Sequence, residues 1–279
     1  MKRQHSHLTP HHPLSGAETT AAEIVSGVDL TGRRAVVTGG ASGVGVETAR
    51  ALASAGAEVT LAVRDTGAGA RTTEDITATT GNQGGRVAHL DLADQDSVAA
   101  FVSAWEGALH ILVNNAGVMA SPELRTPEGW ELQFATNHLG HFALALGLGP
   151  ALARDGGARV VAVSSSAHHR SGVVFEDIHF RRRAYEPWSA DGQSKTANVL
   201  FAVEAAKRRA ADGVTVNALM PGGIRTDLQR HVSDAELARL RARAAGGAEL
   251  EWKTPEHAPD PEAAALLWQD SQDTLAAKG

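Results

Sequence analysis

The chain has 279 residues, enough for one α/β domain with a single large core, and its net charge of −6 comes from 26 basic and 32 acidic residues. This charge gives no reason to expect nucleic acid or an anionic membrane as a partner. The absence of cysteine excludes disulfides, thiolate nucleophiles and thiolate metal sites. These features favour a protein that acts on small molecules.

The first residues, MKRQHSHLTPHHPLSG, have a charged start but no apolar core, and no run of about 18 apolar residues occurs in the sequence. We therefore expect no secretory signal, no membrane-spanning helix and a cytoplasmic location. Residues 1–28 are predicted to form a partly disordered tail. Its histidines (His5, His7, His11 and His12) suggest metal binding, but a polar tail explains them as well, and no metal is predicted.

From residue 29 to residue 279, short apolar runs alternate with helical stretches, which predicts one domain built on a parallel sheet with helices on both faces. Strands are expected at about Arg34–Val37, Glu58–Val63, Arg86–Leu90, Ile111–Val113, Arg159–Val163 and Thr215–Ala218. The clearest helices are expected at about Val44–Ala55, Asp94–Trp105, Pro127–Ala153 and Ala190–Ala211.

A further helix is expected in SDAELARLRARAAGG, where Ser233 and Glu236 form a capping-box pattern. It is part of a predicted substrate loop and helix at about residues 224–250. The later segment DPEAAALLWQDSQ is expected to be a terminal helix.

The strand RRAVVTGG runs directly into ASGVGVETARALA, which places Gly39, Gly43 and Gly45 at a strand-to-helix turn. Glycines there let the backbone turn tightly and approach a pyrophosphate, which the amide donors and the helix dipole favour. The order of strand, turn and helix makes this motif more specific than the glycines alone.

Other motifs follow in chain order. They are N-N-A-G at Asn114–Gly117, a serine-rich strand end at Ser164–Ser166, S-K at Ser194–Lys195 and P-G-G-I-R-T at Pro221–Thr226. Together with T-G-x-x-x-G-x-G at Thr38–Gly45, and over about residues 30–230, they resemble the short-chain dehydrogenase/reductase family. The segment FATNHLGHFAL at 134–144 looks like the branch that includes retinol dehydrogenases.

The resemblance implies a Rossmann-type, doubly wound parallel sheet with a nicotinamide cofactor over its carboxyl edge. The cofactor-binding residues that it implies are Gly39, Ser42, Gly43, Val44 and Gly45 along the phosphates, Asp91 and Leu92 at the adenine, Asn115 at a ribose, Lys195 at the nicotinamide ribose, and Ile224 and Thr226 at the carboxamide.

The residue after the second strand bears on the choice of cofactor. An acid there would bind the adenosine ribose, whereas a base would pair with a 2′-phosphate. This sequence has Arg64, followed by Asp65. A guanidinium matches phosphate geometry, so NADP(H) is favoured over NAD(H), although Asp65 leaves an ambiguity.

In the family a serine, a tyrosine, a lysine and an asparagine act together. The tyrosine exchanges the carbonyl proton, the lysine lowers its pKa, the serine binds the carbonyl oxygen, and the asparagine supports a proton-relay water. Ser165, Lys195 and Asn137 match three of these residues. Asp191 stands where the resemblance implies the tyrosine.

This difference changes the expected chemistry. A carboxylic acid has a pKa near 4, and an adjacent lysine would lower that pKa further, so Asp191 is expected to be ionised and a poor proton donor. Its side chain is also shorter than that of tyrosine and would leave room for water or substrate.

Three further residues are candidates for substrate contact. Tyr185, the only tyrosine, precedes Pro187 and is expected to line or cover the substrate pocket rather than replace the missing acid. His168 is an alternative acid, although a histidine common at this place in the resembling branch favours a structural role. The apolar residues around Val173, Phe175, Trp188 and the Leu228–Leu240 segment indicate a hydrophobic pocket for a small-molecule substrate, such as a specialised metabolite.

The family usually has a seventh strand near its C-terminus, whereas here EWKTPEHAP leads directly into DPEAAALLWQDSQ. We therefore expect the seventh strand to be missing. An open sheet edge would put the usual homo-oligomer interface in doubt.

Three functions are compatible with these residues. The first is an NADP(H)-dependent oxidoreductase that transfers hydride to an imine, an iminium or another unusual electrophile, beside an anionic Asp191. The second is a non-redox cyclase, isomerase or dehydratase that uses Asp191 as a base. The third is a non-catalytic NADP-binding protein, which the retained serine, lysine and asparagine disfavour.

Overall fold

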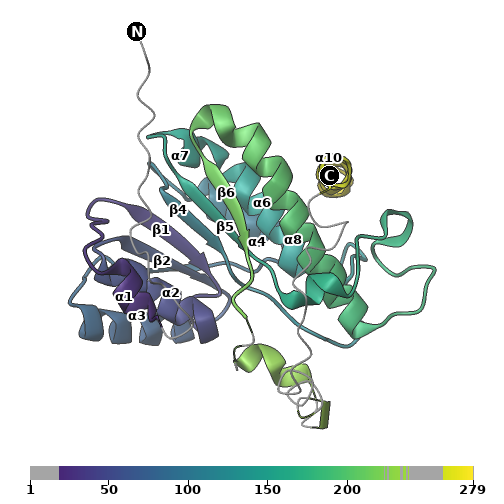
Figure 1. The fold of residues 1–279 in the computed structure, drawn as a ribbon, viewed down its shortest axis with the longest axis horizontal. Coiled ribbons are helices and arrows are strands. Elements are labelled where there is room, and N and C mark those ends of the chain that lie inside the picture. Colours follow the sequence, from purple (N-terminus) through teal and green to yellow (C-terminus); the bar gives the residue numbers. More distant parts are fainter. Residues whose placement is uncertain are drawn as a thin grey trace.

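The computed structural model describes residues 19–222, 224, 226–232, 235, 236, 238 and 260–278. Its centre is a parallel sheet of six strands in the order β3-β2-β1-β4-β5-β6 (Figure 1). The strands are β1 (Arg34–Thr38), β2 (Glu58–Val63), β3 (Arg86–His89), β4 (Ile111–Asn114), β5 (Arg159–Val163) and β6 (Thr215–Leu219). The strand order reverses between β1 and β4, which confirms the doubly wound α/β fold.

Helices cover both faces of the sheet (Figure 1). The helices that precede β5 are α1 (Ala21–Val25), α2 (Gly43–Ser54), α3 (Thr66–Thr80), α4 (Gln95–Ser103), α5 (Leu132–Phe134), the π-helix η1 (Ala135–Leu139), α6 (Gly140–Gly147) and α7 (Gly149–Ala153). Those that follow are α8 (Pro187–Arg209), α10 (Pro261–Ala276) and the 3-10 turns η2 (Ser166–His169), η3 (Phe175–Asp177), η4 (Ala210–Asp212) and η5 (Asp227–His231).

Alternate residues of the central strands face two separate helix layers. Val36 and Leu112 belong to a core cluster with α4, α6 and α8, whereas Val37 and Val113 pack in a cluster with α2 and α3. Because side chains alternate between the faces of a strand, a strand buried on both faces reads as a continuous apolar run. The predicted strands therefore agree with the observed bounds to within one residue.

The helix predicted from Pro127 to Ala153 is wrong at its start. The chain first forms an antiparallel bridge between Arg125 and Glu131, and the Glu131 carboxylate then accepts the backbone N–H groups of Gln133 and Phe134 as the cap of α5. A buried glutamate cap is not among the usual sequence signals for a helix start. The next turn is the π-helix η1, which is followed by α6 and α7.

Helix α3 was not among the clearest predicted helices, because its threonines and glycines show no strong apolar periodicity. Its ends are nevertheless well defined. Asp65 caps the first turn by accepting the N–H of Ala68 at 2.8 Å, and Gly81 ends the helix in the left-handed conformation at φ +75°.

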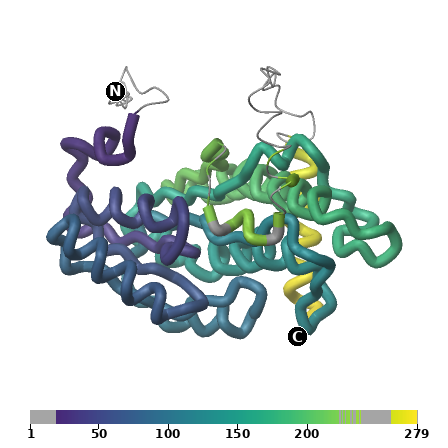
Figure 2. Tube along the Cα trace, turned by 90° about the horizontal axis from the view of Figure 1, so that it is seen from below, coloured from purple at the N-terminus to yellow at the C-terminus, as the bar shows by residue number. Residues whose placement is uncertain are grey.

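The terminal helix α10 is confirmed and packs against α8. The Trp268 ring centroid lies 4.9 Å from that of Phe142 on α6 and 6.2 Å from that of Phe201 on α8. Figure 2 shows α10, in yellow, well separated from the purple N-terminal part that contains α1. Among the described residues no strand follows β6, in agreement with the expected loss of the seventh strand.

Several predictions concern residues outside the described part. The histidine-containing tail up to residue 18 and most of the predicted substrate helix, from 239 to 250, lie there. The predicted tail of residues 1–28 includes the described helix α1. Along the described part of the chain, no helix combines the length and apolar character needed to cross a membrane.

Candidate active site

The glycine-rich turn joins the end of β1 to the start of α2. Gly39 and Gly43 have positive φ angles of +65° and +55°. A Cβ atom built on Gly45 would lie 2.5 Å from the Gly39 carbonyl oxygen and 2.7 Å from Asn115 Nδ2. A side chain at residue 45 would therefore force the turn apart, which explains the glycine physically.

Thr38 ties this turn to the end of β4. Its hydroxyl oxygen accepts the backbone N–H groups of Asn115 and Ala116, both at 2.9 Å, while Asn115 Nδ2 donates to the Thr38 carbonyl at 2.8 Å. The T-G and N-N-A-G motifs, far apart in the sequence, thus form one hydrogen-bonded unit at the carboxyl edge of the sheet.

The segment after β6 reaches the same turn. A Cβ atom built on Gly43 would lie 3.1 Å from Thr226 Cγ2, so Thr226 lies directly against the turn. Ser42 is exposed and makes no side-chain capping bond, Val44 is half-buried, and Ile224 is 47% exposed. The structure therefore brings Thr226 together with the glycine-rich turn.

Arg64 and Asp65 at the end of β2 have different surroundings. Asp65 caps α3, whereas the exposed guanidinium of Arg64 has no hydrogen bond or ion pair with any other described residue. Beyond β3, Asp91 accepts the N–H of Ala93 at 2.9 Å, and Leu92 is buried against α6.

Lys195 lies near the centre of the site on α8 and is 5% exposed. Its ammonium lies 3.4 Å from the Val163 carbonyl oxygen at the end of β5. A Cβ atom built on Gly117 would lie 3.6 Å from Lys195 Nζ and 3.0 Å from Asn137 Oδ1. The N-N-A-G motif, Asn137 and Lys195 are therefore neighbours.

The amide of Asn137 is fully engaged within the protein. Its Oδ1 accepts the N–H of Val118 at 2.8 Å, and its Nδ2 donates to the Val118 carbonyl and to Ser194 Oγ, both at 2.9 Å. Ser194 Oγ in turn donates to the Asp191 carbonyl at 2.8 Å. Asn137 thus holds the loop after β4 against α8.

Ser165 begins the turn η2 at the end of β5. Its half-buried hydroxyl accepts the N–H of Ala167 at 3.2 Å, and its carbonyl accepts Nδ1–H of His168 at 2.5 Å. The neighbouring Ser164 is buried and donates to the Lys195 carbonyl at 2.8 Å. The serine-rich strand end therefore packs directly against the helix that carries Lys195.

Asp191 is 1% exposed, and within the described part of the chain neither of its carboxylate oxygens has a hydrogen-bond partner. Burial raises the pKa of this carboxyl to about 6, although the charges of Lys195 and Arg170 act in the opposite direction. The sequence-based expectation of a lowered pKa is therefore wrong, because loss of water outweighs the attraction of the lysine. Burial likewise lowers the pKa of Lys195, which the charge of Asp191 partly offsets.

Trp188 lies one turn before Asp191 at the start of α8. Its indole Nε1–H donates to Glu236 at 2.5 Å, and the guanidinium carbon of Arg170 lies 4.8 Å from its ring centroid. The indole therefore links α8 to a segment that follows β6.

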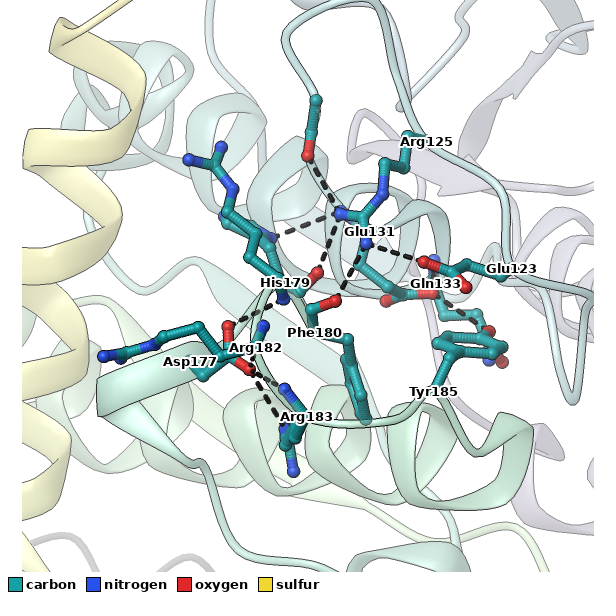
Figure 3. Close-up of polar contacts among 12 residues, drawn as sticks. Glu123, Arg125, Glu131, Gln133, Asp177, His179, Phe180, Arg182, Arg183 and Tyr185 are labelled. Atoms are coloured by element: carbon teal, nitrogen blue, oxygen red, sulfur yellow. Dashed lines mark hydrogen bonds and ion pairs between the residues drawn. The ribbon is translucent and has the colours of Figure 1, made fainter.

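Tyr185, which precedes α8 in the chain, belongs to a polar network (Figure 3). Its hydroxyl accepts from Gln133 Nε2 at 2.8 Å, donates to the Ser121 carbonyl at 3.0 Å and lies 3.3 Å from Glu131 Oε1. Burial raises the pKa of Tyr185 to about 12. These hydrogen bonds fix the phenol in place and anchor the loop that carries Tyr185.

The same network contains residues that the sequence analysis did not single out. Arg125 donates to the carbonyls of His179 and Phe180 at 2.7 and 3.0 Å (Figure 3), and Asp177 accepts the backbone N–H groups of 181–183. No local pattern links Glu131 or Gln133 to Tyr185, since the contacts span more than 50 residues.

Comparison with known proteins identifies the family of this chain. The model of the short chain dehydrogenase family matches residues 33–237. The chain is 59% identical to a Streptomyces antibioticus protein named as a probable oxidoreductase, over 74% of this chain and 70% of that protein. It is 45% identical to human retinol dehydrogenase 12, over 74% of this chain and 66% of that protein.

Solved structures show the same architecture. An uncharacterised protein from Mycobacterium paratuberculosis is 36% identical, with a TM-score of 0.73 over 92% of this chain and 97% of that one. RhlG from Pseudomonas aeruginosa, solved as an NADP active-site complex, is 28% identical, with a TM-score of 0.61 over 87% of this chain and 90% of that one. The chain belongs to the short-chain dehydrogenase family.

Proposed function

We propose that this protein is an NADP(H)-dependent oxidoreductase in which Asp191 takes the place of the catalytic tyrosine, and that it reduces a carbon–nitrogen double bond in a cationic, hydrophobic substrate. The observation that carries the proposal is the Asp191 carboxylate, which is buried and has no hydrogen-bond partner among the residues that the structure describes. A buried ionised group without a partner is costly, and a cationic substrate would supply that partner.

The residues at the carboxyl edge fit a nicotinamide cofactor. Gly39 and Gly45 form a turn with no room for side chains, and the Ser42 side chain makes no capping hydrogen bond to α2. We propose that this turn and Val44 hold the phosphates, that Asp91, Leu92 and Asn115 hold the adenosine half, and that Lys195, Ile224 and Thr226 hold the nicotinamide half.

Arg64 supports NADP(H) over NAD(H). Its guanidinium is exposed and has no described partner, so it is available to a 2′-phosphate. Asp65, the source of ambiguity in the sequence, is committed to capping α3. The RhlG relative was solved with NADP, which supports the same preference.

When bound, NADPH would supply the hydride for the iminium carbon and become NADP⁺, and the carbon–nitrogen π electrons would move to nitrogen and neutralise its charge. No proton has to reach the substrate in this reaction, so the site needs no phenol. Asp191 would hold the cation and orient it, and Lys195 would hold the ribose. Ser165, whose hydroxyl is half-buried at the strand end, would border the substrate.

A second candidate is favoured by the pKa of about 6 at Asp191. A carboxyl that titrates near the operating pH is suited to general acid–base work, so a non-redox elimination, isomerisation or cyclisation would also use this residue. The two candidates differ in whether turnover consumes NADPH.

The test uses purified protein, NADPH and an N-methylated cyclic iminium salt, whose positive charge does not titrate. We expect NADPH consumption and formation of the tertiary amine, with little reduction of the matching cyclic ketone. Asp191→Asn, which keeps the shape but removes the charge, should lower kcat/KM for the iminium roughly 10- to 100-fold, equivalent to the loss of one charged contact. Equal reduction by both proteins would contradict the proposal.

The cytoplasmic location, the small specialised metabolite as substrate and the single domain over 29–279 stay predictions from the sequence.

A further inference from the structure

The cofactor turn and Asn137 are joined by a residue to which the sequence analysis gave no role. His141 lies on α6, is 3% exposed, and reaches both elements. Its Nε2 is 2.8 Å from Thr38 Oγ1, and its Nδ1 is 3.0 Å from the Asn137 carbonyl oxygen. The imidazole therefore bridges the end of β1 and the π-helix η1.

The partners determine which ring nitrogen carries the proton. A carbonyl oxygen can only accept, so Nδ1 must be protonated. Burial lowers the pKa of His141 to about 4, so the ring is neutral at neutral pH and Nε2 is a bare acceptor. The Thr38 hydroxyl then donates to Nε2 at 2.8 Å in preference to the Val113 carbonyl oxygen at 3.3 Å, and its oxygen accepts the N–H groups of Asn115 and Ala116.

The bonds continue from this bridge to the proposed reacting centre. Asn137 donates to Ser194, and Ser194 donates to the Asp191 carbonyl. Asn137 also borders Gly117, which lies beside the Lys195 ammonium. One continuous set of buried hydrogen bonds thus runs from the cofactor turn through His141 to α8.

We propose that His141 is a positioning residue, a neutral imidazole protonated at Nδ1 that sets the distance between the cofactor-binding end of β1 and the Asn137–Ser194–Asp191 contacts. The predicted effect of His141 on kcat rests on the proposed hydride transfer. The predicted protonation of His141 and its effect on cofactor affinity are independent of that reaction.

The first test is direct. The ¹⁵N chemical shifts of the imidazole nitrogens, in protein labelled at histidine and assigned with His141→Phe, should show a protonated Nδ1 and a hydrogen-bonded, unprotonated Nε2. A tautomer with the proton at Nε2 overturns the proposal.

The second test uses matched variants. His141→Phe and Thr38→Val should each weaken NADPH binding and lower kcat for the iminium roughly tenfold, the factor expected for about one buried hydrogen bond. Thr38→Ser, which keeps the hydroxyl, should restore both to within about twofold. The double variant should be less impaired than independent effects predict, because both changes break the same bond.

His138→Phe is the control. His138 is also buried, and its Nε2 lies 2.9 Å from Ser271 Oγ on α10, away from the cofactor turn. This variant should lower the melting temperature about as much as His141→Phe, with NADPH affinity and kcat unchanged. If His141→Phe also changes only the melting temperature, His141 has no positioning role.

These results separate the two proposals. If the wild type binds NADPH with the expected tautomer and the variants weaken that binding, but no iminium is reduced, the proposed reaction fails and the positioning role stands. If iminium is reduced and His141→Phe affects neither affinity nor kcat, the positioning role fails and the reaction stands.

Discussion

Asp191 and Lys195 lie one turn apart on α8 and are both buried, yet neither carboxylate oxygen of Asp191 has a hydrogen-bond partner in the described ranges of the chain. The Lys195 ammonium lies instead 3.4 Å from the Val163 carbonyl oxygen and close to Gly117. The lysine therefore attracts the carboxylate without satisfying it. A negative charge held in this way favours a cation or a proton as its partner.

The pH dependence of catalysis should follow Asp191. Its folded pKa of about 6 means that the carboxylate is lost as the pH falls through that value. For a permanently charged iminium, kcat/KM should therefore rise as the pH increases from about 5 to 7 and then level off, and Asp191→Asn should remove this limb. Steady-state kinetics over this range would measure it. A limb that falls above pH 6 instead would identify Asp191 as a general acid.

The free energy of unfolding should also depend on the protonation of Asp191. The folded protein binds the Asp191 proton more tightly than the unfolded chain, whose aspartate pKa is near 4, so this group lowers stability as the pH rises from about 4 through 6. Between pH 4 and pH 7, the free energy of unfolding of Asp191→Asn should therefore increase by roughly 2–3 kcal/mol relative to that of the wild type. Urea unfolding at both pH values checks this difference, and parallel pH dependences in the two proteins would contradict it.

Arg64 should set the cofactor preference. Arg64→Ala removes one charged contact to a 2′-phosphate and should weaken NADPH binding about 10- to 100-fold, with little change for NADH. Arg33→Ala is a suitable control. Arg33 is also exposed, but it precedes β1 and so lies at the amino ends of the strands, away from the carboxyl edge. Fluorescence titration with both cofactors provides the measurement. An equal loss for NADH would mean that Arg64 does not recognise the phosphate.

Asp191→Tyr should create or raise reduction of simple ketones by at least tenfold. A phenol one turn before Lys195 has a pKa that the ammonium lowers, so it can give a proton to a carbonyl oxygen. Asp191→Phe supplies the same ring without the hydroxyl and should stay at background. NADPH consumption with a cyclic ketone measures the gain. Background activity in the tyrosine variant, with NADPH binding intact, would show that residue 191 does not occupy the proton-donating position.

Much of the framework was predictable because its signals are local. The strands are short apolar runs buried on both faces, and Gly45 follows a strand in a recognisable turn. Helix α10 was predicted from its own residues as well. The start of α5 was not predictable, because Glu131 caps it only after an antiparallel bridge to Arg125 has formed.

The sequence by itself determined the order of the strands along the chain, the glycine-rich turn and the presence of Asp191 four residues before Lys195, since each depends on neighbouring residues alone. Only the tertiary structure decided that the pKa of Asp191 is raised, because this requires the burial that α8 experiences against the rest of the protein. It also decided that Tyr185 is committed to Gln133 and Ser121. Desolvation and long-range hydrogen bonds depend on which segments meet in space, and no local pattern records that.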